Sequence, residues 1–161
     1  MFKMRIGYSE DIHQLVENHP LIVGGIILPS SKGEKAHSDG DVLYHAIAES
    51  LLGALALGDL GTHFPDNDDR YLNMDSSFFV LQAYQMISLK GYKVINIDCT
   101  VFLEDIKLKP YISKIRENVS KLLNIEIENV SIKASTNEKL DSVGKGEAIR
   151  ATSIVLLEEM I

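Results

Sequence analysis

A long helical pattern of apolar residues constrains the fold of this chain more than any other feature of its sequence. Residues 41–57 carry apolar side chains at helical spacing around most of the circumference. A helix of this kind has to be buried on more than one side, so other elements must cover it. The glycine-containing segment at residues 58–61 predicts its end, and Ser38 or Asp39 is the expected N-cap.

Strand and helix patterns alternate along the rest of the chain. Strands are predicted at residues 4–8, 94–102, 130–134 and 148–157, and helices at residues 76–89 and 110–123. Residues 21–28 are predicted to be a strand or a bulged hairpin, and residues 29–35 and 64–69 polar loops. Polar and apolar residues alternate within residues 94–102. The alternation predicts that one face of this strand carries Val94, Asn96, Asp98 and Thr100. The pattern predicts one domain over residues 1–161, of α/β or α+β class, with a small mixed sheet and helices on one face.

Composition excludes several classes of protein. The net charge is −7 and no basic run is present, which argues against non-specific binding to nucleic acid or to an anionic membrane. The single cysteine, Cys99, excludes a disulfide framework within one chain and favours a reducing compartment. No secretory signal pattern follows Lys3 and Arg5, and the apolar residues 51–57 are too few to span a bilayer.

Two polar clusters stand out from these apolar surroundings. Asp11 and His13 are two residues apart, so on an extended strand both side chains point to the same side. His45 follows a second cluster, residues 36–41, and lies one to two turns into the long helix. One carboxylate and two imidazoles with a fourth position open are the ligand set of a catalytic zinc site. Taken singly, each histidine is more often a hydrogen-bonded core or surface residue than a metal ligand.

A third polar cluster, residues 135–139, follows the strand predicted at residues 130–134. Hydroxyl groups at the end of a strand can hold phosphate oxygens. Glu138 could bind a hard cation such as Mg²⁺, which commonly shares its ligands with phosphate. A polar turn without a ligand is the alternative interpretation of this cluster.

The clusters belong to a larger set of motifs in fixed order. These are Asp11-x-His13, Ala36-His37-Ser38-Asp39-Gly40-Asp41-Val42, His45-Ala46, Gly53-Ala54, Leu57-Gly58-Asp59-Leu60-Gly61, Phe64-Pro65-Asp66, Lys90-Gly91-Tyr92, Asn96-x-Asp98, Lys133-Ala134-x-Thr136-Asn137-Glu138-Lys139-Leu140 and Gly144-Lys145-Gly146-Glu147. Over essentially its whole length the chain resembles the 2-C-methyl-D-erythritol 2,4-cyclodiphosphate synthase family of the non-mevalonate isoprenoid pathway.

The resemblance implies a phosphorus–oxygen lyase that converts 4-diphosphocytidyl-2-C-methyl-D-erythritol 2-phosphate into the cyclic diphosphate and releases CMP. It also implies a homotrimer, with the sheets around the central axis and active sites between adjacent subunits. The expected cofactors are Zn²⁺ and Mg²⁺ or Mn²⁺. The expected compartment is the bacterial cytoplasm, or a plastid if a transit peptide has been removed.

The resemblance also assigns residues by motif. Asp11, His13 and His45 are the implied zinc ligands, Glu138 the magnesium ligand, and His37 and Thr136 the catalytic residues. Implied contacts to the substrate's methylerythritol phosphate portion are Ser38, Asp59, Leu60, Gly61, Phe64, Pro65, Asp66 and Asp68. The implied cytidine pocket consists of Leu103, Glu104, Asp105, Ile106, Lys107, Ala134, Ser135 and Thr136.

The implied chemistry needs no protein nucleophile, because the substrate's own 2-phosphate attacks the β-phosphorus of the CDP group. Metal ions and hydrogen-bond donors stabilise the charge that develops. Holding the two ends of one substrate together removes much of the entropic barrier, up to ~7–11 kcal/mol in favourable cases. In this scheme His37 stabilises charge or orients the substrate rather than acting as an obligatory base.

The chain departs from the family at positions that the family gathers near the trimer axis, around a central cavity able to take up an isoprenoid diphosphate. Ser9-Glu10 replaces glycine and an apolar or aromatic residue, Ser142 replaces an aromatic residue, and Lys145 replaces arginine ahead of Glu147. Lysine cannot reproduce the two-pronged contact of arginine with a diphosphate, so we expect weak binding there. The segment 103–106 also differs from the small, neutral run usual in the cytidine loop.

Two other functions use the same residues. A zinc-dependent phosphoesterase would need a general base beside the open metal position, and the candidates are His37 and Asp41. A catalytically silent trimeric binding protein would hold a structural zinc with four protein ligands.

Overall fold

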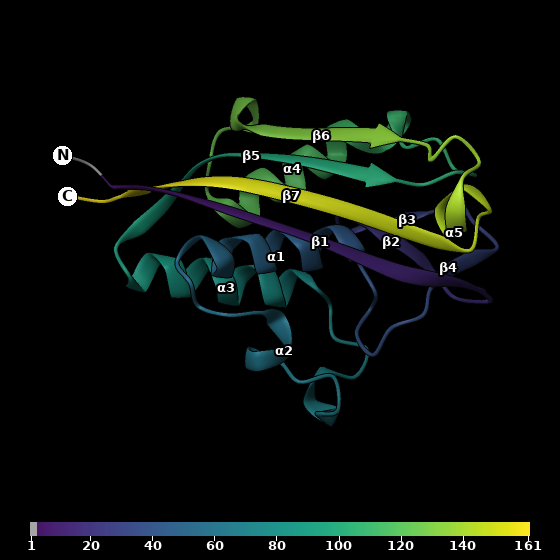
Figure 1. The fold of residues 1–161 in the computed structure, drawn as a ribbon, viewed down its shortest axis with the longest axis horizontal. Coiled ribbons are helices and arrows are strands. Elements are labelled where there is room, and N and C mark those ends of the chain that lie inside the picture. The colour runs from purple at the N-terminus through teal and green to yellow at the C-terminus, as the bar shows by residue number, and fades with distance from the viewer. Residues whose placement is uncertain (1–2) are drawn as a thin grey trace.

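The computed structural model describes residues 3–161, which form a layer of strands covered on one side by helices (Figure 1). The strands are β1 (Met4–Glu17), β2 (Leu21–Val23), β3 (Ile26–Leu28), β4 (Lys32–Glu34), β5 (Tyr92–Phe102), β6 (Val130–Ser135) and β7 (Ala148–Glu159). The α-helices are α1 (Val42–Ala54), α2 (Leu60–His63), α3 (Ser77–Leu89), α4 (Ile112–Leu123) and α5 (Asp141–Gly144). Short 3₁₀ helices lie at Asp69–Tyr71, Lys109–Tyr111 and Ile127–Asn129.

Five strands form one mixed sheet in the order β4-β1-β7-β5-β6. β5 and β6 are parallel, joined by the crossover that contains α4, and the other neighbours are antiparallel. The remaining strands, β2 and β3, form a separate hairpin. The mixed sheet agrees with the sequence prediction, and its order sets β1 three strand spacings, roughly 14 Å, from β6.

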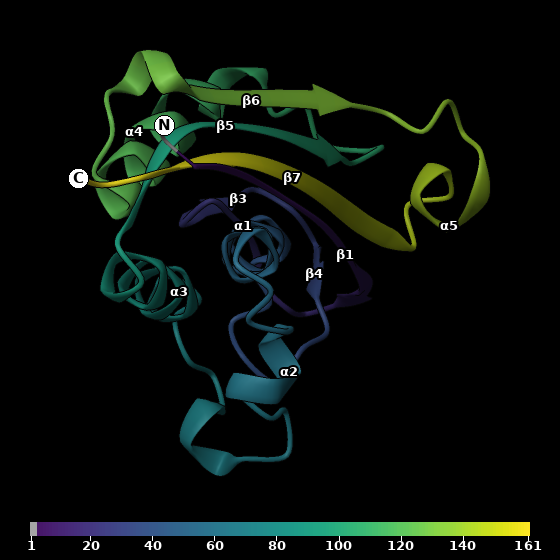
Figure 2. The same cartoon turned by 60° about the vertical axis from the view of Figure 1, so that its left-hand side comes forward.

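The apolar helix α1 packs against β1 and β7 and contacts α3, so it is covered on more than one side, as expected (Figure 2). Gly7 in β1 permits a close approach, because a Cβ atom there would collide with the carbonyl oxygen of Ser50. The helix α4 packs on β6 and against α3. Helices α1, α3 and α4 therefore cover one face of the sheet and enclose the hydrophobic core with it.

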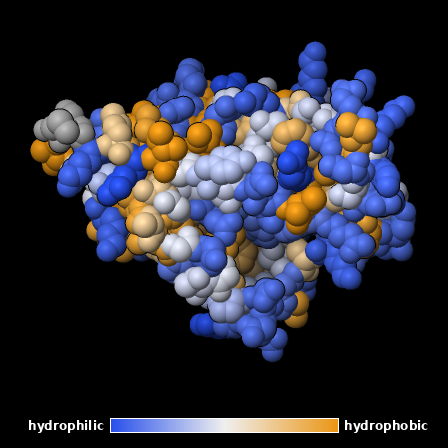
Figure 3. Space-filling model, viewed as in Figure 1, coloured by the Kyte–Doolittle hydropathy of each residue, from blue (hydrophilic) through white to orange (hydrophobic). Residues whose placement is uncertain are grey.

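The other face of the sheet carries apolar side chains that no helix within residues 3–161 covers. On β1 these include Ile6, Tyr8 and Ile12, with exposed fractions of 68%, 59% and 52%, and Ile154 on β7 is 44% exposed. We call the surface formed by these four residues the open face. Hydrophobic residues also gather near the end of the sheet where the two termini lie (Figure 3). An apolar surface of this kind is typical of a subunit interface.

Several element boundaries differ from the sequence prediction. The first strand continues to Glu17 instead of ending at residue 8, so Asp11 and His13 lie within β1. Residues 29–35 were predicted as a loop, yet they contain β4, which extends the sheet by pairing with the end of β1. The N-cap of α1 is Asp41 rather than Ser38 or Asp39.

The predicted alternation of residues 94–102, which lie in β5, is wrong at Val94. The register shifts between Val94 and Asn96, so a bulge at Ile95 turns Val94 to the buried face with Ile97. Bulges of this kind insert one residue and reverse the alternation locally. The short helices α2 and α5 were not predicted, because four residues carry too little periodicity to detect. Among residues 3–161, no helix is long and apolar enough to cross a membrane.

Candidate functional site

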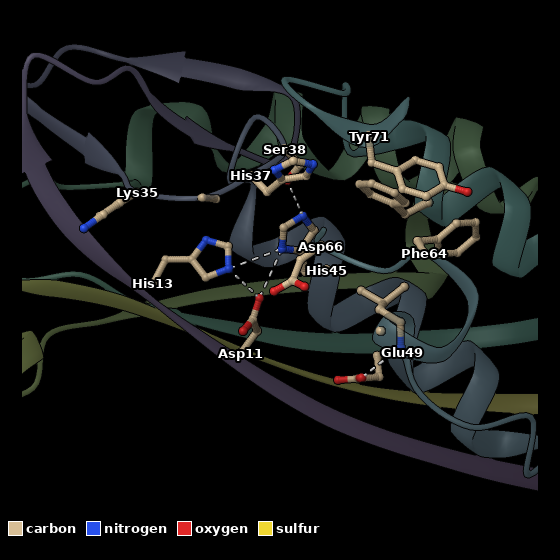
Figure 4. A pocket seen from close by; sticks show the side chains of 14 residues that line it. Asp11, His13, Lys35, His37, Ser38, His45, Glu49, Phe64, Asp66 and Tyr71 are labelled. Carbon is tan, nitrogen blue, oxygen red and sulfur yellow. Dashed lines mark hydrogen bonds and ion pairs between the residues drawn. The ribbon is translucent and has the colours of Figure 1, made fainter. Parts of the chain in front are cut away.

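A cavity of about 430 Å³ lies where β1, the loop before α1, α1 and α2 meet (Figure 4). Its walls contain Asp11, His13, His37, Ser38, His45, Leu60, Gly61, Phe64 and Asp66, all of them predicted from the sequence. Also in the walls are Lys35, Ala36, Glu49, Tyr71 and Phe79. The fold thus brings together residues from the first half of the chain that are up to 68 positions apart, from Asp11 to Phe79.

Asp11, His13 and His45 meet at one end of this cavity, and we call them the triad. Asp11 Oδ2 lies 2.9 Å from His13 Nε2 and 3.2 Å from His45 Nδ1. The two imidazole nitrogens are 3.3 Å apart, and their rings cross at 61°. Three ligand-type atoms within a few ångströms of one another form a candidate site for a divalent metal ion.

The triad is held in place by both the strand and the helix. Asp11 and His13 point to the same side of β1, as the alternation of a strand requires. His45 lies in the first turn of α1, whose N-cap is the fully buried Asp41. Asp41 accepts backbone N–H bonds from Tyr44 at 3.1 Å and from Gly24 and Gly25 at 3.0 and 2.8 Å, which ties the helix start to the β2–β3 hairpin.

The ligand atoms of the triad carry lone pairs that can bind a cation. His13 Nδ1 lies 2.9 Å from the carbonyl oxygen of Gly40, which can only accept, so Nδ1 carries the proton and Nε2 presents a lone pair to Asp11. A carboxylate oxygen and an imidazole lone pair at 2.9 Å repel each other unless a proton or a metal ion lies between them. Burial alone would raise the pKa of Asp11, but when the two imidazoles carry a second proton, their hydrogen bonds and charge hold that pKa well below its usual range.

One wall of the cavity, which adjoins His45 at Phe79, is aromatic. Phe64, Tyr71 and Phe79 pack edge-on or tilted, with ring centroids between 5.1 and 5.9 Å apart. His37 Nε2 donates to the carbonyl oxygen of Asp68 at 2.9 Å, which fixes the ring of His37 beside Ser38 in the wall. The cavity therefore combines a polar end with a partly aromatic wall.

Some predicted contacts lie outside this wall. Asp59 is the N-cap of α2 and accepts from Thr62 N at 2.9 Å and Thr62 Oγ1 at 2.7 Å, and these bonds lower the pKa of its carboxyl. The carboxylate of Asp68 forms an ion pair with Arg70, with a closest distance of 2.6 Å. The backbone carbonyl oxygen of Asp68 accepts from His37. Pro65 is likewise not part of the cavity wall.

The predicted cytidine and magnesium residues form a second group beyond β5 and β6. Leu103 N donates to the carbonyl oxygen of Ser135, which sets the two loops side by side, and the Leu103 side chain is buried. Glu104 accepts from the backbone N–H groups of Asn137 and Lys139 at 2.9 and 3.1 Å. Its carboxylate thus holds the loop that carries the exposed Glu138.

This second group is absent from the wall of the triad cavity. Thr136, Glu138 and residues 103–107 follow β5 and β6, whereas the triad lies on β1 and α1 at the other side of β7. The structure of one chain therefore does not unite the two predicted halves of the site.

The predicted central-cavity residues lie on β1 and in the turn around α5. Glu10 lies on the exposed side of β1 and accepts from the hydroxyl of Tyr8 at 2.9 Å. Ser142 belongs to α5, Lys145 follows it, and both Lys145 and Glu147 are exposed.

Sequence reasoning missed two kinds of wall residue. Glu49 lies four residues after His45, so helical spacing alone places both on the same side of α1. Glu49 accepts from Ser9 Oγ at 2.8 Å and from Leu60 N at 3.1 Å, and so connects β1 to α2 across the floor of the cavity. Tyr71 and Phe79 carry no comparable signal in the sequence.

Comparison with known proteins indicates the same family as the sequence motifs do, over nearly the whole chain. The sequence profile of the YgbB family matches residues 4–158. A 2-C-methyl-D-erythritol 2,4-cyclodiphosphate synthase from Chloroherpeton thalassium is 46% identical, covering 98% of this chain and 100% of the relative. The synthase of the same name from Brachyspira hyodysenteriae is 49% identical, covering 97% of this chain and 99% of the relative.

A solved structure of a 2C-methyl-D-erythritol-2,4-cyclodiphosphate synthase in its CDP-bound form superposes with a TM-score of 0.88. That protein is 35% identical, and the match covers 95% of this chain and 99% of the other. Both the sequence and the fold therefore agree with one family over nearly every residue. This chain belongs to the YgbB family.

Proposed function

We propose that this chain converts 4-diphosphocytidyl-2-C-methyl-D-erythritol 2-phosphate into 2-C-methyl-D-erythritol 2,4-cyclodiphosphate and CMP. The relatives' names support this reaction, and with it an enzyme of isoprenoid precursor synthesis. The single observation that carries the proposal is the triad, in which three ligand atoms converge at the polar end of a cavity of about 430 Å³. A cavity of that size suits the methylerythritol phosphate portion of such a substrate.

Zinc is the metal that the triad suits best, since one carboxylate and two imidazoles leave a fourth position open. When bound, such an ion would polarise the phosphoryl oxygens and neutralise charge that develops on them. Glu138 is the proposed ligand for Mg²⁺ or Mn²⁺, which would do the same for the CDP phosphates. No nucleophile from the chain is required, because the 2-phosphate of the substrate is already an anion.

The remaining residues of the cavity bind, orient and exclude water. His37 and Ser38 line the cavity with the triad and are proposed to hold a phosphate oxygen. Leu60 and Gly61, at the start of α2, face the cavity and are proposed to contact the erythritol hydroxyls together with Asp59. The aromatic wall keeps bulk water from the phosphorus atom and so favours attack by the internal phosphate.

The proposed active site is completed by a second copy of the chain. The triad lies on β1 and α1, whereas the cytidine group follows β5 and β6, on the other side of β7. The open face of the sheet is apolar and uncovered, and three copies packed by this face around an axis would bury it. Such a homotrimer would set the Glu138 loop of one subunit beside the triad of its neighbour. The CDP-bound relative supports nucleotide binding in this family.

One observation weakens the alternative of a zinc-dependent phosphoesterase. Asp41, one of its two candidate bases, is fully buried and accepts three backbone N–H bonds, so it cannot reach a water molecule in the cavity. Burial raises the pKa of Asp41 to about 6, against the effect of those bonds. His37 remains, but its Nε2 donates to the carbonyl oxygen of Asp68.

Product analysis tests the proposal. The purified chain, loaded with Zn²⁺ and Mg²⁺, is incubated with the CDP-methylerythritol phosphate, and the products are separated by ion-exchange chromatography. We expect CMP and the cyclic diphosphate in equal amounts. CMP with a linear bisphosphate would identify a hydrolase, and an unchanged substrate would identify a binding protein.

A further inference from the structure

Ser76, directly before α3, is fully buried and lies outside both the cavity wall and the cytidine group. A serine at this position commonly caps the helix through its side chain. Ser76 makes no such bond, and its hydroxyl is turned toward the triad. Its Oγ lies 2.8 Å from Nε2 of His45, the imidazole nitrogen that faces away from Asp11.

The direction of the hydrogen bonds around Ser76 follows from Asp39. The two carboxylate oxygens of Asp39 accept from the backbone N–H groups of Asp41 at 3.0 Å and Ser76 at 3.1 Å. The Ser76 hydroxyl makes a short contact with Oδ1 of the same carboxylate, and because a carboxylate only accepts, Ser76 donates there. Because the single proton of this hydroxyl is donated to Asp39, the Ser76 oxygen accepts a hydrogen bond from His45 Nε2.

We propose that Asp39 and Ser76 form a relay that fixes His45 as its Nε2–H tautomer and so makes Nδ1 the metal ligand. Nδ1 then presents a lone pair toward Asp11 Oδ2 at 3.2 Å and His13 Nε2 at 3.3 Å. Asp39 and Ser76 are positioning residues, because they act through His45. Hydrogen bonds of this kind orient metal-binding imidazoles and raise their basicity.

A second hydroxyl explains why the relay is needed. Ser38 Oγ lies 3.1 Å from the same Nε2 atom and accepts from the backbone N–H of Gly40 at 3.2 Å. The Ser38 hydroxyl still has its own proton to donate. Without Ser76, it can donate to Nε2 and stabilise the opposite tautomer, in which Nδ1 carries a proton and cannot bind a metal. The relay excludes that arrangement.

The tautomer can be measured without metal or substrate. In the metal-free protein with ¹⁵N-labelled histidine, two-bond nitrogen–proton NMR spectra distinguish the two tautomers of a neutral imidazole. At a pH where the His45 signals no longer titrate, we expect the Nε2–H tautomer. Observation of the Nδ1–H tautomer in the wild-type protein would overturn the proposal.

Variants test the two positioning residues. Ser76→Ala should weaken zinc binding about 10–100-fold in competition with a chromophoric chelator, and increase the Nδ1–H tautomer. Ser76→Thr keeps the hydroxyl and should restore both. Ser77→Ala, one residue further along, is the matched control and should leave both unchanged. Wild-type zinc affinity in Ser76→Ala would contradict the relay.

Asp39→Ala gives an independent measurement if a threonine does not fit the buried site. Removing the carboxylate leaves the Ser76 hydroxyl free to donate to His45, so the population of the Nδ1–H tautomer should increase. An unchanged tautomer in a folded Asp39→Ala variant would overturn the proposal. The measurement of zinc affinity rests on the proposed metal site, whereas the measurement of the tautomer does not. Neither measurement depends on turnover. Failure of the proposed reaction is therefore distinguishable from failure of the relay.

Discussion

The buried carboxyl group of Glu34 should make this protein less stable as the pH rises. Glu34 ends β4, with only 3% of its surface exposed. Its Oε2 accepts from Ile22 N at 3.0 Å, whereas Oε1 is buried and has no hydrogen-bond partner among the described residues. Burial, together with the nearby Asp41 and Asp39, raises the pKa of Glu34 to about 8.

The size of the effect follows from the shift. The pKa of Glu34 rises from an ordinary value of 4.5 to about 8 in the folded chain. At about 1.4 kcal/mol per unit, ionised Glu34 reduces the free energy of unfolding by roughly 5 kcal/mol. Because the folded pKa is the higher one, the stability is fully present below pH 4.5, is lost as the pH rises toward 8, and is constant above it.

The test compares Glu34→Gln with the wild type by urea unfolding at one protein concentration. Glutamine does not ionise, so its advantage over the wild type should grow by about 4 kcal/mol between about pH 5 and about pH 9. A constant offset is also expected, since the amide leaves a buried donor without a partner. The exposed Glu128→Gln is the matched control and should show no pH-dependent difference. Parallel stability curves for Glu34→Gln and the wild type would refute the reasoning.

Four further predictions concern the site. His45→Ala should lose most of its zinc by metal analysis and still fold, because a two-ligand site binds weakly; the exposed His19→Ala should keep its zinc, and full zinc in His45→Ala would refute the triad. Glu138→Gln should raise the Mg²⁺ concentration needed for half-maximal turnover with zinc content unchanged, and wild-type turnover at limiting Mg²⁺ would count against it. Co-refolding His45→Ala with a Thr136→Ala, Glu138→Ala double variant should restore some activity, because one interface in a mixed trimer then combines an intact triad with an intact Glu138 loop. No recovery in proven mixed trimers would place each site within one subunit. Geranyl diphosphate should give little or no thermal stabilisation, because Glu10, Ser142 and Lys145 oppose its capture, and a strong shift would show that these departures do not matter.

The sequence predicted the metal triad because its signals are local. Asp11 and His13 share a face whenever the chain is extended, and His45 lies on a helix whose apolar pattern is unmistakable. The meeting of the three residues was confirmed at distances of 2.9 to 3.3 Å. The helices on one face of a mixed sheet were also confirmed, because the apolar periodicity of each long segment is likewise a local property of the sequence.

Features that depend on distant partners could not be predicted. The bulge at Ile95 and the pairing of β4 with β1 follow from the sheet as a whole, not from the residues themselves. Asp41 became the N-cap in place of Ser38 or Asp39 because the β2–β3 hairpin supplies two N–H groups to its carboxylate. Ser76 carries no periodic or motif signal, and its contact with His45 exists only in the folded chain.

In the proposed reaction the substrate's own phosphate, and not water, attacks the β-phosphorus. Turnover in a mixture of H₂¹⁶O and H₂¹⁸O, followed by phosphorus NMR, tests it directly, because an ¹⁸O atom shifts the resonance of the phosphorus that it joins. Internal attack breaks the bond between the β-phosphorus and the bridging oxygen, which leaves with CMP, and consumes no water. With internal attack, we expect a cyclic diphosphate and CMP that both lack ¹⁸O. An ¹⁸O-shifted phosphorus resonance in either primary product would contradict it.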